Sequence, residues 1–297
     1  MRASELAKQM KCAGFGATAV GEASELYSQM LFGKQTIFLS FTSNMVSCGL
    51  REVFAQLCKR KMCSAIITGI GSVEEDLMKT NSSFRLGTFH EDDTKLHKKG
   101  TNRIGNILVE NSHYMWLEKK LQPFFEQEYQ KQKSLGRPLA PHELIADLGS
   151  QIKDENSFLY WCVKNSIPVF CPAPTDGAFG LQAYFFRQKR TDFAIDVAGD
   201  LTKLGQLVLD ADKTGGVVLG GGFAKHHLLG ANILRGGLDS AIYVGTGTQY
   251  DGSLSGARTN EAVSWGKLAS SKKSVYVEAD AAIAFPLIMC AVIDRME

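Results

Sequence analysis

The chain has 297 residues, of which 44% are hydrophobic, and a formal net charge of +2. This length and apolar content suit a single globular domain over residues 1–297 with a sizeable core. The balanced charge and the lack of a long basic run argue against a nucleic-acid partner. No stretch of about 18 apolar residues occurs, which argues against a membrane span.

The seven cysteines are odd in number, and no two of them have CxxC spacing. We therefore expect neither a disulfide framework nor a metal site, and most of the cysteines should be small buried residues in a reducing compartment. Residues 1–11 lack the apolar core of a secretory signal. A cytoplasmic location is the expectation.

Short apolar runs alternate with helical patterns along the chain. Helices are expected at 43–59 and 193–211, and a capping box at 72–75 is expected to open another. The charged stretch 90–106 is expected to be a surface loop. Strands are expected at 36–41, 65–68, 167–171, 216–219, 241–244 and 274–277.

Strands that alternate with helices predict an α/β fold of the Rossmann-like, doubly wound type, with a mostly parallel sheet and helices on both faces. Ligands bind such sheets in the crevice beyond the carboxyl ends of the strands. Polar and glycine-rich segments follow five of the expected strands, after Phe41, Thr68, Cys171, Leu219 and Val244. We therefore expect one site assembled from several strand ends.

Some of these segments carry candidate chemistry. The glycine turns at 69–71 and 220–222 suit a phosphate, but neither has the full GxGxxG pattern, and a plain strand-to-helix turn is the alternative. Asp176 is a candidate for holding a ribose hydroxyl, with a simple Asp-Gly turn as the alternative. His226 is a candidate general base or anion contact, and a structural histidine is the alternative.

The densest polar segment runs from Asp251 to Lys267. A lysine beside a tryptophan and a carboxylate, as Lys267 is beside Trp265 and Glu261, loses its proton readily. The neutral amine is a nucleophile toward imines and carbonyls. On composition alone, a solvated surface lysine and a core tryptophan are the plainer interpretations.

Residues 261–267 read Glu-Ala-Val-Ser-Trp-Gly-Lys, which resembles, letter for letter, the active-site segment of eukaryotic deoxyhypusine synthases. Other segments resemble that family in the same order along nearly the whole chain. They are 42–47, 73–76, 102–106, 174–177, 220–222, 225–227 and 279–281.

The resemblance implies an NAD-dependent enzyme that forms tetramers, with each active site at a dimer interface and built from two chains. In that family, spermidine is oxidised by hydride transfer to NAD. Its aminobutyl group passes as an imine to a lysine of the enzyme, and then to one lysine of translation initiation factor five-A.

The resemblance also assigns roles by position. Lys267 matches the imine-forming lysine, and His226 matches the histidine of proton transfer. The amine site is assigned to Glu74, Glu75, Glu261, Trp265, Gly252 and Ser253. The NAD contacts are assigned to Ser43, Asn44, Met45, Val46, Ser47, Asp176, Gly221, Thr246, Gly247, Asp280 and Ala281.

Two positions depart from the family pattern. The family places an aspartate shortly after the Thr-Asp-Gly turn and another after Asp-Gly-Ser, where this chain has Leu181 and Leu254. A pocket that excludes water must pair each ammonium of spermidine with a carboxylate or with strong hydrogen-bond acceptors. Loss of one partner of a buried pair costs about 3–5 kcal/mol, which would weaken binding roughly a hundredfold or more.

These departures favour a catalytically impaired paralogue, like the helper subunits of this family in trypanosomatids. Such a chain would bind NAD, bind spermidine weakly or not at all, and pair with a catalytic synthase in a heterotetramer. The factor five-A precursor would then be met through the complex. One alternative is an active synthase with an altered amine preference, since Lys267 and His226 are kept. The other is a scaffold protein that has kept only the fold and does not bind NAD.

Overall fold

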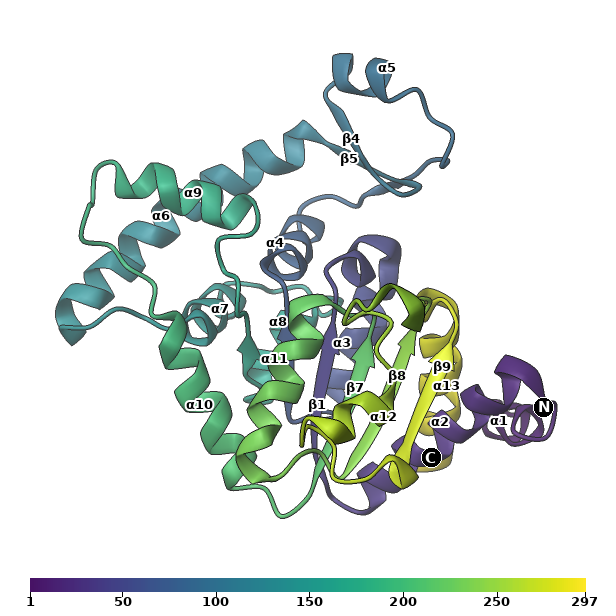
Figure 1. Cartoon of the computed structure of the whole chain (residues 1–297). Helices are drawn as coiled ribbons and strands as arrows, with labels where there is room; N and C mark the ends of the chain where they lie inside the picture. Colours follow the sequence, from purple (N-terminus) through teal and green to yellow (C-terminus); the bar gives the residue numbers. More distant parts are fainter.

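The computed structural model describes residues 1–297, except for the side chain of Ser271. Its centre is a sheet of six strands in the order β6-β2-β1-β7-β8-β9 (Figure 1). These strands are β1 (Thr36–Phe41), β2 (Ala65–Thr68), β6 (Val169–Phe170), β7 (Thr214–Leu219), β8 (Ser240–Gly245) and β9 (Ser274–Glu278). Because every pairing is parallel, the six carboxyl ends lie along one edge of the sheet.

Helices cover both faces of this sheet. Side chains alternate between the faces of a strand, so Val217 of β7 belongs to one core and Val218 to the other. The first core includes α2 (Phe15–Phe32), α3 (Arg51–Lys59), α8 (Phe158–Lys164) and α13 (Ala281–Met296). The second includes α10 (Val197–Leu209), α11 (Gly222–Asn232) and α12 (Thr259–Ser264). The predicted doubly wound α/β fold is confirmed.

The apolar runs of the sequence located the strands well. The strands expected at 36–41 and 65–68 have the observed bounds, and those at 216–219, 241–244 and 274–277 lie within β7, β8 and β9. The run 167–171 contains the shorter β6, and the helix expected at 193–211 contains α10. Strands of a parallel sheet are buried on both faces, which is why their sequences stand out as apolar runs.

The helix expected at 43–59 is interrupted. The chain makes a π-helical turn at Val46–Leu50, and the regular α3 begins only at Arg51. Gly49 has a φ of +102°, a conformation that glycine adopts without a clash of Cβ. The Lys79 Nζ donates to the carbonyl oxygens of Val46 and Ser47 at 2.5 and 3.1 Å, so it binds carbonyls within this turn.

The capping box expected at 72–75 is wrong. Helix α4 (Ile70–Lys79) begins three residues earlier, with Gly69 as its N-cap in place of Ser72. Ser72 is fully buried, and its hydroxyl shares a hydrogen bond of 2.6 Å with the Thr68 hydroxyl instead of capping a backbone N–H. Glu75 therefore lies well inside the helix and does not reach back to cap it.

The loop expected at 90–106 is also wrong, because this stretch contains regular structure. Helix α5 (Asp93–Lys98) is capped by Asp92, whose carboxylate accepts the Lys95 N–H at 3.1 Å. Strand β4 (Thr101–Ile104) pairs with β5 (Ile107–Glu110), and β3 (Arg85–Leu86) completes a small antiparallel sheet. Most side chains here face solvent, so the stretch has no apolar periodicity to reveal these elements.

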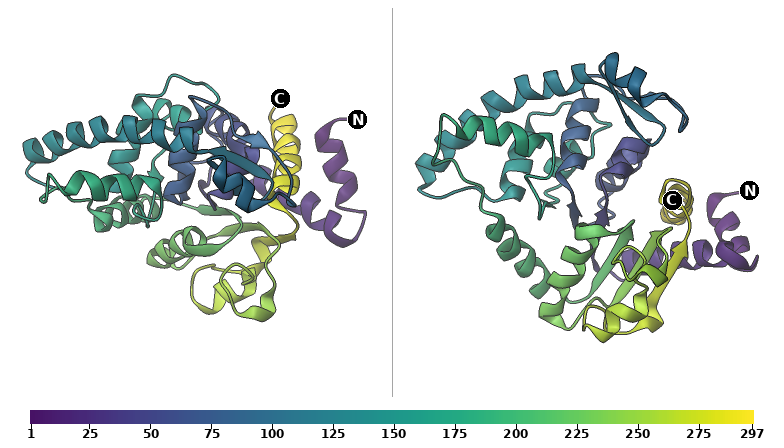
Figure 2. Two further views of the ribbon diagram at one scale, coloured as in Figure 1. Left: turned by 90° about the horizontal axis from the view of Figure 1, so that it is seen from above. Right: turned by 45° about the horizontal axis from the view of Figure 1, so that its top comes forward.

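Helices α6 (Asn111–Leu135) and α9 (Ala178–Arg187) pack on one another and on α4. Both stand out from the main sheet, at the upper left of Figure 1 and at the left of both views in Figure 2. Helix α7 (Pro141–Ser150) packs on α8 and on the edge strand β6. The sheet edge at β6 is therefore covered by helices.

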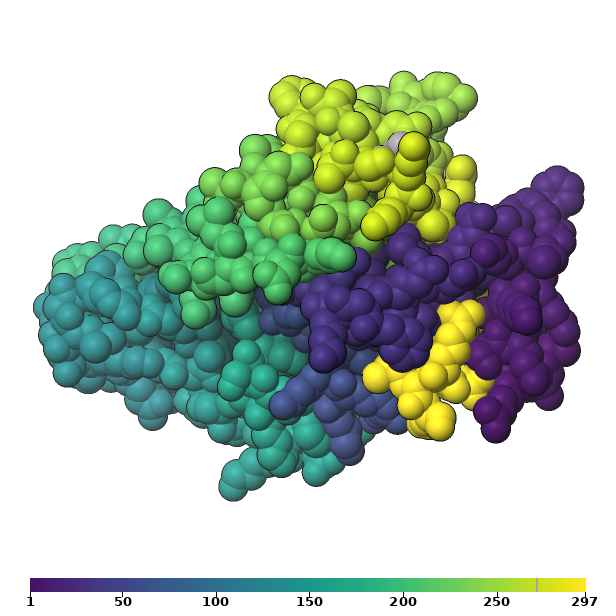
Figure 3. All heavy atoms as spheres, turned by 90° about the horizontal axis from the view of Figure 1, so that it is seen from below, coloured from purple at the N-terminus to yellow at the C-terminus, as the bar shows by residue number. Residues whose placement is uncertain are grey.

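The two ends of the chain meet. Helix α1 (Ala3–Met10) packs against α13, and Figure 3 shows these segments side by side. The Ser4 N–H donates to the Asp294 carboxylate at 3.0 Å. Throughout the described chain, no helix combines the length and the apolar character that crossing a membrane requires.

Most of the cysteines are buried, as predicted. Cys58, Cys63, Cys162 and Cys171 are buried, and the other three are exposed. All seven are free thiols.

Candidate active site

The strand order reverses between β1 and β7. The chain runs outward from β1 to β2 and β6, then returns to β7 and continues to β8 and β9. Ligands of open α/β sheets bind in the crevice at such a point. The segments after the two strands touch there, since the Thr42 N–H donates to the Leu219 carbonyl at 3.3 Å. Gly220 has a φ of +83°, and a Cβ on it would lie 2.8 Å from the Thr42 hydroxyl.

Three consecutive acidic residues of α4, Glu74, Glu75 and Asp76, are buried beside this crevice, and we call them the α4 carboxylate cluster. Glu75 accepts a hydrogen bond of 2.6 Å from the Ser47 hydroxyl. Burial raises the pKa of Glu75 to about 7, although the Ser47 hydrogen bond and the Lys79 ammonium act in the opposite direction. A carboxyl group that titrates near neutral pH can exchange a proton with an amine.

Glu74 is engaged by another helix. Its Oε2 accepts the Phe179 N–H at 2.8 Å, in the first turn of α9. The unpaired N–H groups and the dipole of a helix start favour a carboxylate there. Burial raises the pKa of Glu74, and the Phe179 hydrogen bond opposes that rise. Glu74, predicted as an amine-site residue, anchors the start of α9.

Asp76 holds three elements together in the core. Its carboxylate accepts hydrogen bonds from Arg51 Nε at 2.6 Å, from the Ser157 hydroxyl at 2.6 Å and from the Leu159 N–H at 3.1 Å. Burial raises the pKa of Asp76, and the positive charge of Arg51 opposes that rise. The Asp76 carboxylate therefore joins α4 to α3 and α8.

The predicted imine-forming lysine lies at a different edge of the sheet. The Lys267 carbonyl accepts the Leu238 N–H at 3.0 Å, just before β8, so its backbone is near the amino end of that strand. Its ammonium lies 5.1 Å from the centre of the Trp265 ring. Both side chains line a small pocket with Glu261, Leu254 and Lys225, and we call these five residues the α12 lysine pocket. In Figure 1, α12 lies in front of β8 and apart from α4.

Lys225 is the buried cation of this pocket. Its Nζ donates to the carbonyl oxygens of Leu254 at 2.8 Å and Ala257 at 2.7 Å, and lies 4.5 Å from the centre of the Tyr243 ring. Burial lowers the pKa of Lys225 to about 8, against the effect of the Glu261 charge. Lys225 thus fixes the loop that leads into α12.

The two leucines that depart from the family pattern lie in different halves. Leu181 of α9 is 54% exposed and lines a hollow between α6 and α9 together with Tyr114 and Gly177. Leu254 lines the α12 lysine pocket. Leu181 therefore borders a wide hollow, whereas Leu254 borders a narrow pocket of about 30 Å³.

The cofactor contacts predicted after β1 differ in exposure. The side chains of Met45 and Val46 are buried in the first core, which leaves their backbone for any cofactor. Ser43 is half-buried and Asn44 is exposed. The Thr42 hydroxyl donates to Asn44 at 2.6 Å and so fixes its side chain.

The other acidic and small cofactor candidates lie after β6, β8 and β9. Asp176 and Thr246 are exposed. The Asp280 carboxylate accepts the Ala282 N–H at 2.9 Å and caps α13, and Ala281 is buried in the first turn of that helix. Asp280 therefore has a structural partner in this chain.

A loop covers two of the predicted cofactor glycines. A Cβ on Gly221 would lie 2.4 Å from the Cα of Ser255, and a Cβ on Gly247 would lie 2.8 Å from the Ser255 carbonyl oxygen. The loop that Lys225 fixes passes too close for any side chain at these positions. This approach alone explains why both residues are glycine.

The remaining predicted residues lie at the surface. His226 is exposed on α11, beside the half-buried His227. Gly252 and Ser253 are exposed in the loop before α12, where the Ser253 N–H donates to Asp251 at 2.8 Å.

Two lysines near the predicted sites received no role from the sequence. Lys79 follows Glu75 by four residues in α4, a spacing at which helical side chains interact. Lys225 precedes His226 within one of the family-like segments. The position of Lys79 beside Glu75 could have been predicted from their spacing. The role of Lys225 could not, because the loop carbonyls that it binds are distant in the sequence.

Comparisons with known proteins identify the family of this chain. The family model described as deoxyhypusine synthase matches residues 5–292. A probable deoxyhypusine synthase of Pyrococcus furiosus is 42% identical over 295 residues, which cover 95% of this chain and 88% of that protein. The deoxyhypusine synthase of Senecio vernalis is 40% identical over 312 residues, with 96% and 84% covered.

A solved structure also matches nearly the whole chain. The crystal structure of a protein provisionally named deoxyhypusine synthase, from Entamoeba histolytica, has a TM-score of 0.72 and 25% identity. The match covers 98% of this chain and 93% of that one. The resemblance seen in the motifs is confirmed, and the chain belongs to the deoxyhypusine synthase family.

Proposed function

We propose that this chain is a deoxyhypusine synthase-family subunit with little activity alone. In this proposal it binds NAD and pairs with a catalytic synthase subunit in hypusine formation on translation initiation factor five-A. The observation that carries the proposal is the position of Leu181 and Leu254, each of which lines a pocket in one half of the predicted site. A polycationic amine needs a counter-charge for each ammonium in such a pocket, and leucine supplies none.

The carboxylates that remain in α4 compensate only partly for the two missing aspartates. Glu74 is bound to the start of α9, and Asp76 is bound to Arg51. Glu75 is left as the carboxyl group of the α4 carboxylate cluster that can meet an ammonium. Because its pKa is raised to about 7, a substantial fraction of it is uncharged near neutral pH. Spermidine should therefore bind this chain weakly.

NAD fits the crevice between β1 and β7. Gly222 has a φ of +65°, and no described atom lies within 4 Å of where its Cβ would be, which leaves open space at the start of α11. A helix start and a glycine turn together suit a pyrophosphate. Ser43 and Asn44 would hold the cofactor from β1, and Asp176 would hold a ribose hydroxyl. Bound NAD supplies the hydride acceptor for amine oxidation.

Pairing follows from the separation of the two halves. The α4 carboxylate cluster lies beyond the carboxyl end of β2, whereas Lys267 lies near the amino end of β8. A site that uses both would therefore draw them from two chains, as the family resemblance implies. In a mixed dimer, a partner with both aspartates would supply a full set of counter-charges in the half that it contributes.

The test is to assay the purified chain, a full-motif synthase and their mixture for deoxyhypusine formation, and to measure the mass of each assembly in solution. We expect little turnover from the chain alone, a hetero-oligomer on mixing, and more activity than the synthase shows alone. We also expect NAD to raise the melting temperature of the chain alone. Ordinary synthase activity from the chain alone, or no association on mixing, would contradict the proposal.

An active synthase with a different amine preference is the second candidate, favoured by the shared pocket of Lys267, Trp265 and Glu261. Incubation with NAD and a series of amines, followed by borohydride reduction, would trap a Lys267 adduct if one forms. The Lys267→Arg variant is the matched control, because it keeps the positive charge but forms no imine. An adduct in the parent alone would favour this candidate, and no adduct with any amine would count against it.

A further inference from the structure

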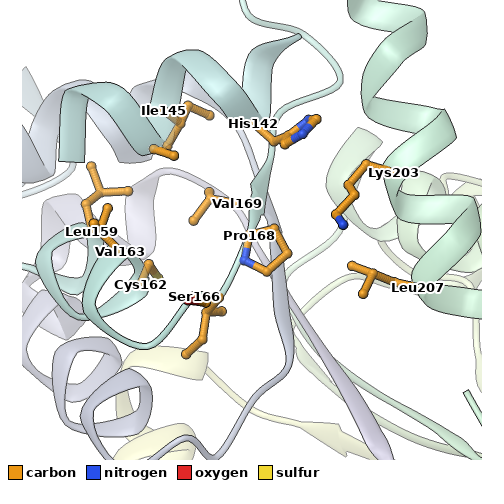
Figure 4. A pocket seen from close by; sticks show the side chains of 12 residues that line it. His142, Ile145, Leu159, Cys162, Val163, Ser166, Pro168, Val169, Lys203 and Leu207 are labelled. Carbon is orange, nitrogen blue, oxygen red and sulfur yellow. The ribbon is translucent and has the colours of Figure 1, made fainter. Parts of the chain in front are cut away.

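A cavity of about 360 Å³ lies at the β6 edge of the main sheet, between α7, α8 and α10 (Figure 4). It shares no residue with the α4 carboxylate cluster or the α12 lysine pocket. Its volume falls in the range of small-molecule sites, about 300–1,000 Å³. It is more than twice the volume of an engineered cavity of about 150 Å³ that holds benzene.

The inner wall of this cavity is apolar. Ile145 of α7, Leu159 and Cys162 of α8, and Val169 of β6 line it, and each is at most 4% exposed. Little of this wall is open to solvent, so a hydrocarbon group would gain chiefly by filling the hollow and contacting these side chains. The wall therefore suits the hydrocarbon part of a ligand.

The charged groups lie together on one side. Figure 4 shows His142 and Lys203 on the α10 side of the cavity, with the Lys203 side chain directed toward Pro168 and Leu207. Lys203 forms no ion pair with any residue that the structure describes. An ammonium beside an apolar cavity attracts a negatively charged ligand group.

The buried Asp200 carboxylate beneath His142 already accepts hydrogen bonds from within the chain. The Asp200 carboxylate accepts the His142 N–H at 2.8 Å, meets His142 Nδ1 at 2.7 Å, and accepts the Cys171 N–H at 3.1 Å. Asp200 is fully buried beneath the histidine, which fixes the ring and leaves Nε2 for another partner. The charge of Lys203 is thus left for a ligand.

We propose that this cavity binds a small monocarboxylate with an apolar tail, such as a medium-chain fatty acid. The tail would lie against Ile145, Leu159 and Val169, and the carboxylate would pair with the Lys203 ammonium. One free ammonium matches the single charge of a carboxylate better than the higher charge of a phosphate.

The test uses the full chain and octanoate as the probe, with binding followed by thermal melting and by calorimetry. Acetate lacks the tail, and octylammonium carries the opposite charge on the same tail. We expect octanoate to raise the melting temperature in a saturable way, because it binds the native state. Acetate and octylammonium should leave it unchanged.

Two variants locate the site. Lys203→Glu reverses the charge at the cavity, and Ala146→Trp fills the space from an exposed position in α7. Each should raise the Kd for octanoate at least about tenfold. Lys8→Glu is the matched control, since Lys8 lies in α1 on the opposite side of the sheet, and it should leave the Kd unchanged.

No saturable octanoate binding by the parent chain would refute the proposal. The same Kd in the parent and in Lys203→Glu, or equal binding of octylammonium, would refute the role of charge. Both cavity variants change surface positions, so their melting temperatures without ligand should match the parent, and lost binding then reports on the site.

Discussion

The α4 carboxylate cluster and the α12 lysine pocket belong to the same predicted reaction but are built differently. In the cluster, all three carboxyl groups are buried and each accepts a hydrogen bond from another element of the same chain. The lysine pocket lies at the surface, where Trp265 is 65% exposed and Glu261 is exposed. One half is therefore organised within the chain, and the other presents an aromatic side chain to solvent.

This difference indicates which contacts stabilise each half: contacts within the chain or contacts with a partner. Buried carboxylates are tolerated because neighbouring donors offset the cost of burial. An exposed tryptophan gains little within its own chain, and such residues are enriched where a partner covers them. Substitutions in the cluster should change the stability of the single chain, whereas those in the lysine pocket should change the assembled complex.

The largest effect on stability is expected for Asp76→Ala. Removal of this carboxylate leaves the Arg51 guanidinium, which is 4% exposed, without its fully buried partner and paired with the partly exposed Asp154 carboxylate at 2.7 Å. Loss of one member of a buried ion pair costs about 3–5 kcal/mol in the free energy of unfolding. Urea denaturation of the two proteins measures it. Glu25→Ala, which removes an exposed ion pair with Lys11, is the control and should change little. Equal small losses in both variants would show that the cluster does not support the core.

A pH-dependent effect is expected for Glu75→Gln. Burial raises the pKa of Glu75 from 4.5 to about 7, so the folded chain binds this proton more tightly than the unfolded chain. Stability is then lost as the pH rises from about 4.5 to about 7, because the buried group must ionise. The amide has no such titration, and its oxygen still accepts from the Ser47 hydroxyl.

The variant should therefore be more stable than the parent by about 2–4 kcal/mol at about pH 8, and about equal to it at pH 4.5. Denaturation curves of both proteins at the two pH values give the difference. A difference that stays constant between these pH values would mean that the pKa of Glu75 is the same in the folded and unfolded chains.

Restoring the missing carboxylates tests the impairment itself. The double variant Leu181→Asp, Leu254→Asp places one acidic side chain in each half of the predicted site. With subsaturating spermidine, deoxyhypusine formation by the chain alone should rise roughly a hundredfold or more. Leu201→Asp, at an exposed leucine of α10, is the matched control and should leave the rate unchanged. A folded double variant with no gain in rate would show that the leucines are not the cause of low activity.

The sequence located the strands and the segments that follow them, because a parallel sheet needs apolar runs and its site needs polar strand ends. It could not give the partners of individual side chains. Glu74 binds the N–H of Phe179, which lies 105 residues further along the chain. The turn at Val46–Leu50 interrupts an apparent helix, and Lys79 of another helix binds its carbonyls.

The resemblance implied a site built from two chains, but the motifs could not show where Glu75 and Lys267 lie on the sheet. Glu75 and Lys267 both match one reaction, but each lies where its segment meets the sheet, after or before a strand of fixed direction. The α4 segment follows β2 at the carboxyl edge, and the α12 segment returns to the amino end of β8. Only the topology separates them.

The smallest effect on stability is expected for Trp265→Ala. The side chain is already 65% exposed in the single chain, so its loss should change the free energy of unfolding by less than about 1 kcal/mol. In the mixed assembly with a catalytic partner, the same variant should lower deoxyhypusine formation, because a covered tryptophan supplies contact area to the amine or the partner. Phe15→Ala, at an exposed aromatic residue of α2, should change neither quantity. If Trp265→Ala instead destabilises the single chain by several kcal/mol, the lysine pocket depends on contacts within its own chain. Both halves would then be stabilised by contacts within the single chain.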